Sequence, residues 1–129
     1  MSVIRQFEDI EGWKVARELT QAVYRMTIEG EFARDYGLKD QIRRASVSIM
    51  SNIAEGFGRG GNQEFVHFLT IARGSAAEVQ AQLYVALDAG HISQEQFSEL
   101  NELAANCGRQ IGGLIRYLKQ STLKGSKHK

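Results

Sequence analysis

Apolar residues recur three or four positions apart in four separate segments, and this spacing decides most of what the chain can fold into. Such a spacing places the residues on one face of an α-helix, whereas a strand would need strict alternation. The most regular stripe alternates steps of three and four over three heptads: Phe97, Leu100, Ala104, Cys107, Ile111, Leu114 and Leu118. That period is typical of nearly antiparallel helices packed in a four-helix bundle.

The other three stripes complete an all-α interpretation. One of them consists of Leu38, Ile42, Ala45, Ile49 and Ile53. Helix-forming residues dominate and the chain has no proline, so nothing breaks these segments. We predict one domain over residues 1–120, an up-down-up-down antiparallel bundle with a disordered basic tail at 121–129. The expected helices span about 10–29, 38–57, 63–89 and 94–120.

Helix starts have local signals of their own. Asp9 and Asn62 each stand just before an apolar stripe and are predicted N-caps. Ser93 and Gln96 have the spacing of a capping box, the strongest start signal in the chain. The connector at 30–37 is expected to be an ordered loop, with its two aromatic residues packed on the bundle.

Two lines of polar residues run beside the apolar stripes of the second and third helices. Ser48 and Asn52 stand in mid-helix, where short polar side chains are poor helix formers unless they bond to a neighbour. We interpret both lines as a buried network or a subunit interface; a solvated face is the alternative. Glu55 is expected to pair with Arg59 or Arg73. The residues of the two lines are Ser48, Asn52, Glu55 and Arg59, and Arg73, Gly74, Ser75 and Glu78.

Charge gives weak evidence for a nucleic-acid partner. The net charge is only +1, so the whole chain is not an electrostatic match for a polyanion. Basic residues nevertheless gather after Glu102, the last acid in the sequence. A solvated tail is the simpler explanation. The candidate nucleic-acid contacts are Arg43, Arg44, Arg109, Arg116, Lys119 and Lys124.

No motif for catalysis, a cofactor or a metal has the surrounding sequence or spacing that its function requires. Residues 56–61 match G-x-G-x-x-G by letter, but that motif is meaningful only after a strand, and here a helix precedes it. His67, His91 and His128 have no metal-ligand spacing, either among themselves or with Cys107. The sequence therefore predicts no enzyme, no catalytic residue, no cofactor and no metal.

The single cysteine and the hydropathy indicate a cellular setting. Cys107 lies on an apolar stripe and cannot form an intramolecular disulfide, so a buried thiol is expected. No apolar run approaches the length of a membrane span, and no secretory signal region is present. We therefore expect a cytoplasmic protein with no membrane partner.

Three segments carry a resemblance to a known family. They are GWKVARELT at 12–20, QIRRASVSIMSNIAEGFGR at 41–59 and EFVHFLTIARGSAAEVQAQL at 64–83. Together they resemble the 23S rRNA-intervening sequence proteins, also called four-helix-bundle proteins. By position, the family's first motif matches Arg43, Arg44, Asn52, Glu55, Gly56 and Arg59, and its second matches Arg73, Gly74, Ser75 and Glu78. The chain departs where the family often has proline, at Met50 and near residues 32–33.

The resemblance implies a small cytosolic bacterial bundle that assembles into a homopentameric ring without catalytic activity. Some similar proteins are the accessory variability determinants of diversity-generating retroelements, which bind nucleic acid and a reverse transcriptase. The favoured function is thus an oligomeric scaffold whose main partner is itself. The alternative is an accessory protein that binds RNA or DNA through arginines concentrated by ring symmetry, with a further protein partner.

Overall fold

Helices are the only regular secondary structure in the part of the chain that the structure describes. A computed structural model describes residues 3–128, with side chains for residues 3–121. A 3₁₀ turn η1 (Phe7–Asp9) precedes five helices: α1 (Glu11–Met26), α2 (Gly30–Arg34), α3 (Tyr36–Gly58), α4 (Asn62–Asp88) and α5 (Gln94–His128). None of these helices is long and apolar enough over its described residues to cross a membrane.

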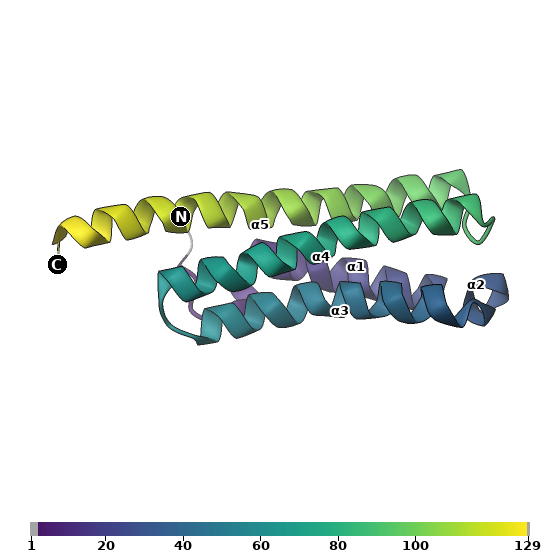
Figure 1. The fold of residues 1–129 in the computed structure, drawn as a ribbon, viewed down its shortest axis with the longest axis horizontal. Helices are drawn as coiled ribbons and strands as arrows, with labels where there is room; N and C mark the ends of the chain where they lie inside the picture. The colour runs from purple at the N-terminus through teal and green to yellow at the C-terminus, as the bar shows by residue number, and fades with distance from the viewer. Residues whose placement is uncertain (1–2, 129) are drawn as a thin grey trace.

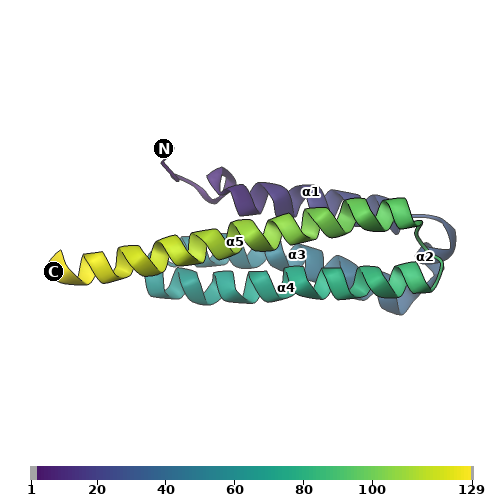
Figure 2. The ribbon, with the colours of Figure 1, turned by 90° about the horizontal axis from the view of Figure 1, so that it is seen from above.

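Four of the helices form an antiparallel bundle, and the short α2 is a connector at one end. Successive long helices run in opposite directions, which gives the predicted up-down-up-down path (Figures 1 and 2). Each helix packs on two neighbours in the cyclic order α1, α3, α4, α5.

The end of α5 differs from the prediction. The sequence suggested that the last helix stops near residue 120 and that a disordered tail follows, yet the helical backbone continues to His128. These last turns extend past the ends of the other helices (Figures 1 and 2). The residues after Gln120 include no proline and only one glycine, so no strong helix breaker ends the segment.

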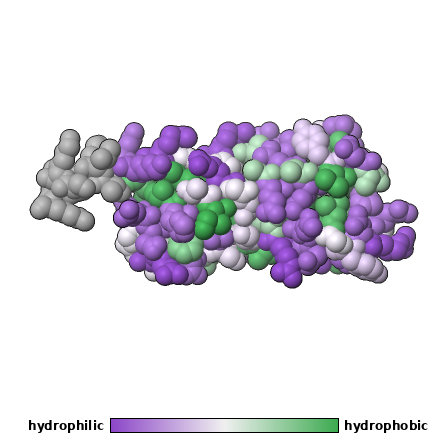
Figure 3. Space-filling model, viewed as in Figure 1, coloured by the Kyte–Doolittle hydropathy of each residue, from purple (hydrophilic) through white to green (hydrophobic). Residues whose placement is uncertain are grey.

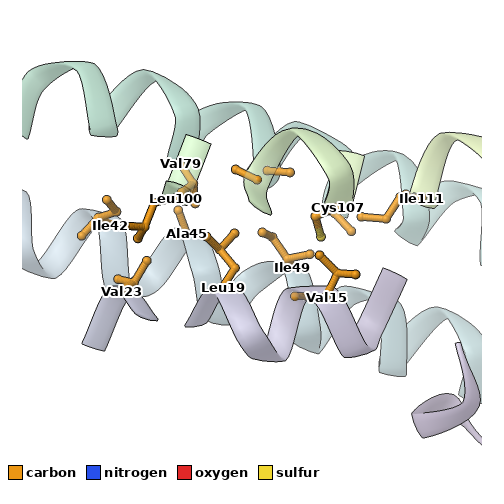
Figure 4. Close-up of a cluster of buried hydrophobic side chains, with 14 of the residues drawn as sticks. Val15, Leu19, Val23, Ile42, Ala45, Ile49, Val79, Leu100, Cys107 and Ile111 are labelled. Atoms are coloured by element: carbon orange, nitrogen blue, oxygen red, sulfur yellow. The ribbon is translucent and has the colours of Figure 1, made fainter. Parts of the chain in front are cut away.

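The core follows the apolar stripes almost residue by residue. Side chains from all four long helices meet along the bundle axis, among them Leu19, Ile49 and Cys107, each fully buried (Figure 4). The α3 stripe is buried at all five predicted positions. On α5 the next buried hydrophobic side chain after Ile111 is Ile115; Leu114 is half-buried against the core, and Leu118 is buried as predicted.

Two of the three predicted helix starts are wrong. Asp9 lies in η1, where its carboxylate accepts the backbone N–H groups of Arg5 and Gln6, and α1 begins after Ile10. Asn62 is the first residue of α4 rather than its cap, and Gly61 precedes it without a capping side chain. The third start is confirmed. Ser93 Oγ accepts the N–H of Gln96 at 3.1 Å, and Gln96 Oε1 accepts the N–H of Ser93 at 2.9 Å.

The connector at 30–37 contains a short helix, where the sequence predicted an ordered loop. Gly30, with φ of +76°, opens the five-residue helix α2, a conformation that glycine adopts at little cost. Phe32 is packed inside the bundle as expected, with 1% of its surface exposed. Tyr36 is not, since it is 72% exposed as the first residue of α3.

Candidate functional site

The inner parts of the two polar lines meet between α3 and α4. Ser48 Oγ and Ser75 Oγ lie 3.0 Å apart and share a hydrogen bond. The Asn52 side-chain amide donates to Ser48 Oγ at 3.0 Å and to the Ser48 carbonyl at 2.9 Å. Ser75 is buried, and Ser48 and Asn52 are half-buried. The structure thus brings together three of the predicted residues in one small hydrogen-bonded cluster.

The outer parts of the lines face solvent in the single chain. Glu55 forms the expected i,i+4 ion pair with Arg59 at 2.9 Å, but both side chains are about half exposed, at 52% and 50%. Exposed pairs of this kind contribute little to stability. Arg73 and Glu78 are exposed on α4. Glu55 pairs with Arg59 and not with Arg73, the other partner that the sequence suggested. Within one chain the buried part of the network therefore consists of neutral side chains.

Gly74 lies on the exposed side of α4 with nothing above it. A Cβ placed on Gly74 would meet no atom within 4 Å, so no helix of this chain uses the glycine for close approach. Ile71 and Val85 follow the same stripe of α4 and are 41% and 53% exposed. The side of the molecule seen in Figure 1 carries separate hydrophobic groups among hydrophilic ones (Figure 3). The α3–α4 face consists of these three α4 residues together with Glu55, Arg59 and Glu78, and it is the strongest candidate site in the molecule.

Gln82 continues the α4 polar line but leaves one atom unsatisfied. The residue is 7% exposed, and its Oε1 has no hydrogen-bond partner among the described residues. A buried acceptor without a partner costs about 1–3 kcal/mol. We therefore expect Gln82→Met, which keeps the volume and removes the polar atoms, to stabilise the protein by about 1 kcal/mol in urea unfolding. Gln80→Met is the matched control, because Gln80 Nε2 donates to Asn101 Oδ1 at 3.1 Å; this variant should lose stability. A destabilised Gln82→Met would contradict the prediction.

Three of the predicted nucleic-acid contacts have partners inside the chain. Arg43 donates from Nε to Thr27 Oγ1 at 2.7 Å and lies over the ring of Tyr24, 4.3 Å from its centroid. It thereby fixes α3 to the end of α1. Arg44 pairs with Asp40 at 2.9 Å, and Arg109 pairs with Glu102 at 2.7 Å; both pairs are exposed.

The remaining predicted contacts lie towards the end of α5. Arg116 and Lys119 are exposed, and neither has an ion pair within the described residues. The side chain of Lys124 lies outside the described part of the chain. Of the six predicted contacts, two described cations are thus available to an external anion without breaking an internal pair.

One polar contact, at the α2 end of the bundle, was not predicted from the sequence. His91 Nε2 and Asp35 Oδ2 lie 3.0 Å apart, and the imidazole stacks on the Phe32 ring at 5.1 Å. The hydrogen bond from His91, with a second from the backbone of Leu38, lowers the pKa of Asp35. Asp35 caps α3 through that second bond, a role that an acid just before a helix could have indicated. No local pattern could have placed His91 beside it.

The structure places Cys107 in the bundle core and His67 beside an aromatic ring. Burial raises the pKa of the Cys107 thiol to about 12, so this group is neither a nucleophile nor a thiolate ligand near neutral pH. No three His, Cys, Asp or Glu side chains among the described residues gather as a metal site would require. His67 contacts the edge of the Phe68 ring and no acid.

One glycine of the glycine-rich segment has a packing role. Gly56 is a buried residue of α3, where a Cβ would lie 2.7 Å from Cβ of Phe68 on α4. Gly60 and Gly61 line an open cavity at this end of the bundle together with apolar side chains such as Phe65 and Tyr117. Residues 56–61 thus comprise the end of α3, where that helix crosses α4, and the turn that joins the two helices.

Comparisons with known proteins agree with this architecture. The family model of the 23S rRNA-intervening sequence protein matches residues 8–113. A crystal structure of a protein of unknown function from the S23 ribosomal protein family of Bacteroides thetaiotaomicron shares the fold, with a TM-score of 0.73 at 20% identity. The alignment covers 81% of this chain and 97% of that one. No curated protein matches the chain. Since the family model spans most of its length, the chain belongs to the 23S rRNA-intervening sequence protein family.

Proposed function

We propose that this protein is a non-enzymatic scaffold that assembles in the cytoplasm into a ring of identical subunits, five in number, through its α3–α4 face. The number five follows from the resemblance to the family's pentameric members. The observation that carries the proposal is Gly74, an exposed glycine in the middle of a 27-residue helix with open space around it.

A glycine in mid-helix lowers stability by about 1 kcal/mol relative to alanine. Inside the chain nothing offsets that cost at Gly74, because no neighbouring helix approaches it. A second molecule would offset it by packing its backbone against the bare helix surface. Exposed Ile71 and Val85 on the same stripe supply apolar area for such a contact.

The charges of the face also suit a copy of the same chain. Glu55 and Arg59 lie on α3 and Glu78 lies on α4, so the face carries both acids and a base, whereas Arg73 lies towards α5. A rotated copy could set acid against base across the contact. In a head-to-tail arrangement the α3 side of one subunit would meet the α4 side of the next, and such a contact closes into a ring where the rotation between neighbours divides the full circle evenly.

The decisive test is Gly74→Arg measured by light scattering. The wild type is expected at five times 14.4 kDa, or 72 kDa. The variant is expected at the monomer mass, because the long charged side chain would occupy the contact. Open space at this position means that the monomer should still fold. Far-UV circular dichroism checks that it does.

Gly37→Arg is the matched control. Gly37 is an exposed glycine of α3 that also has nothing within 4 Å of its added Cβ. This variant should keep the wild-type mass. A monomeric wild type, or a Gly74→Arg protein that stays at the wild-type mass, would overturn the proposed interface.

A second candidate function is binding of RNA or DNA. The observation that favours it is that Arg116 and Lys119 have no acid partner within the described residues. Ring symmetry would repeat these cations around the assembly. Binding to a single-stranded RNA oligonucleotide should then weaken steeply with salt, with a log–log slope that grows by about 0.7 for each phosphate neutralised. Affinity that does not change between 50 and 200 mM salt would remove this candidate.

A further inference from the structure

Two arginines from different helices converge above Gly112. A Cβ placed on Gly112, a buried residue of α5, would lie 3.6 Å from Nη1 of Arg116 and 3.8 Å from Nη1 of Arg73. The two nitrogens are therefore separated by no more than the sum of these distances, 7.4 Å. Because residue 112 has no side chain, both guanidinium groups can approach the surface of α5 at this point.

Neither guanidinium has a counter-charge within the described part of the chain. No ion pair joins Arg73 or Arg116 to a carboxylate there. Glu102, the last acid on α5, is already bound by Arg109 at 2.7 Å. Two like charges this close repel each other, and an anion between them would reverse that cost.

The acid on α4 nearest in sequence to Arg73 points elsewhere. Glu78 follows it by five residues, which turns its side chain by about 140° around the helix. Glu78 therefore belongs to the α3–α4 face, whereas Arg73 lies towards α5. Leaving out the neighbouring residues and backbone of α5 itself, the described atoms within 4 Å of a Cβ on Gly112 belong to these two arginines.

From this geometry we infer that Arg73, Gly112 and Arg116 form a binding site for one phosphate group. An oxyanion with several oxygens can accept from two guanidinium groups at once, at N···O distances of about 2.7–2.9 Å. Two nitrogens up to 7.4 Å apart can each reach a different oxygen of a single tetrahedral phosphate. Arginine presents planar, paired donors suited to this geometry, which lysine does not.

The phosphate can come from two sources with the same chemistry, free inorganic phosphate or the backbone of a nucleic acid. The inference stands on the arginine geometry and does not depend on assembly through the α3–α4 face. If the nucleic-acid candidate holds, this site would supply one of its backbone contacts.

The first arm of the test uses inorganic phosphate on the full chain. Potassium phosphate is titrated at pH 7 while the amide signals of Gly112 and Gly113 are followed by NMR, with potassium chloride at equal ionic strength as the reference. We expect saturable shifts with phosphate only. Arg73→Gln and Arg116→Gln should each weaken binding at least tenfold. Arg17→Gln, which removes an exposed, unpaired arginine from α1, should bind as the wild type does.

The second arm uses a single-stranded oligouridine and separates the two sources. Weaker RNA binding in both Arg73→Gln and Arg116→Gln, with competition by phosphate, supports a backbone phosphate as the ligand. RNA binding that the variants leave unchanged, alongside lost phosphate binding, supports free phosphate. Equal shifts in phosphate and chloride, or phosphate binding that survives both substitutions in folded protein, would overturn the site.

Discussion

Replacing Gly56 by alanine is expected to destabilise the protein by about 1–3 kcal/mol, the cost of overpacking a well-packed contact. The added Cβ would lie 2.7 Å from Cβ of Phe68, and 3.1 and 3.3 Å from Cδ1 and the backbone oxygen of Phe65. Cβ and backbone atoms cannot rotate away, so α4 would have to shift as a unit. Helix propensity alone would favour alanine by about 1 kcal/mol, and the steric term should outweigh it.

Gly58 provides a matched control two residues further along α3. A Cβ there would meet nothing within 4 Å, and the backbone φ is not positive. Gly58→Ala should be neutral or stabilising by up to about 1 kcal/mol, since it lowers the entropy of the unfolded chain. Urea unfolding of both variants tests the pair. Equal stability of the two would show that the α3–α4 crossing relaxes around an added methyl group.

The sequence predicted the bundle well because periodicity carries the burial information. The five apolar positions of α3 from Leu38 to Ile53 are all buried, and they needed no tertiary information beyond the step of three or four. The antiparallel order followed from short connectors between long helices. The apolar spacing repeats over many residues, so one wrongly assigned residue would hardly change the predicted helices.

Helix ends were harder to predict because competing local hydrogen bonds differ by about 1 kcal/mol. Asp9 could cap α1 or close the turn η1, and the structure shows the second. The end of α5 has the same character. Small differences in helix propensity decide whether the backbone stops near Gln120 or continues to His128.

The candidate site was predictable only in part. Ser75, Glu78 and Gln82 are three and four residues apart, yet Ser75 and Gln82 are buried while Glu78 is exposed. This polar line runs along the border of the buried face of α4, so the position of the neighbouring helix decides which of its residues are buried. A single sequence does not give that position. The approach of Arg73 to Gly112 joins residues 39 positions apart, and no local pattern predicts it. In the sequence, Arg73 belongs to a polar line and Arg116 belongs to the basic segment after Glu102, so nothing there links the two arginines.

The Cys107 thiol should react with an alkylating reagent about a thousandfold more slowly in the native protein than in the unfolded chain. Burial raises its pKa from 9.0 to about 12, so at pH 8 the thiolate fraction falls by three orders of magnitude. The sulfur also lies inside the bundle, where Sγ donates a weak hydrogen bond to the Gly12 carbonyl at 3.6 Å. Iodoacetamide labelling followed by mass spectrometry, with and without urea, measures the ratio.

An exposed cysteine on the same helix serves as the control. Gln110→Cys in a Cys107→Ala background should react at the rate of a free thiol, because residue 110 is exposed on α5. The raised pKa also has a consequence for stability. Above about pH 9 the unfolded chain loses a proton that the native state keeps, so Cys107 lowers stability progressively from pH 9 towards pH 12. The Cys107→Ala variant should lose less stability over that range than the wild type. Native labelling within tenfold of the unfolded rate would mean that α5 separates readily from α1, and the bundle would then be far less rigid than its buried core indicates.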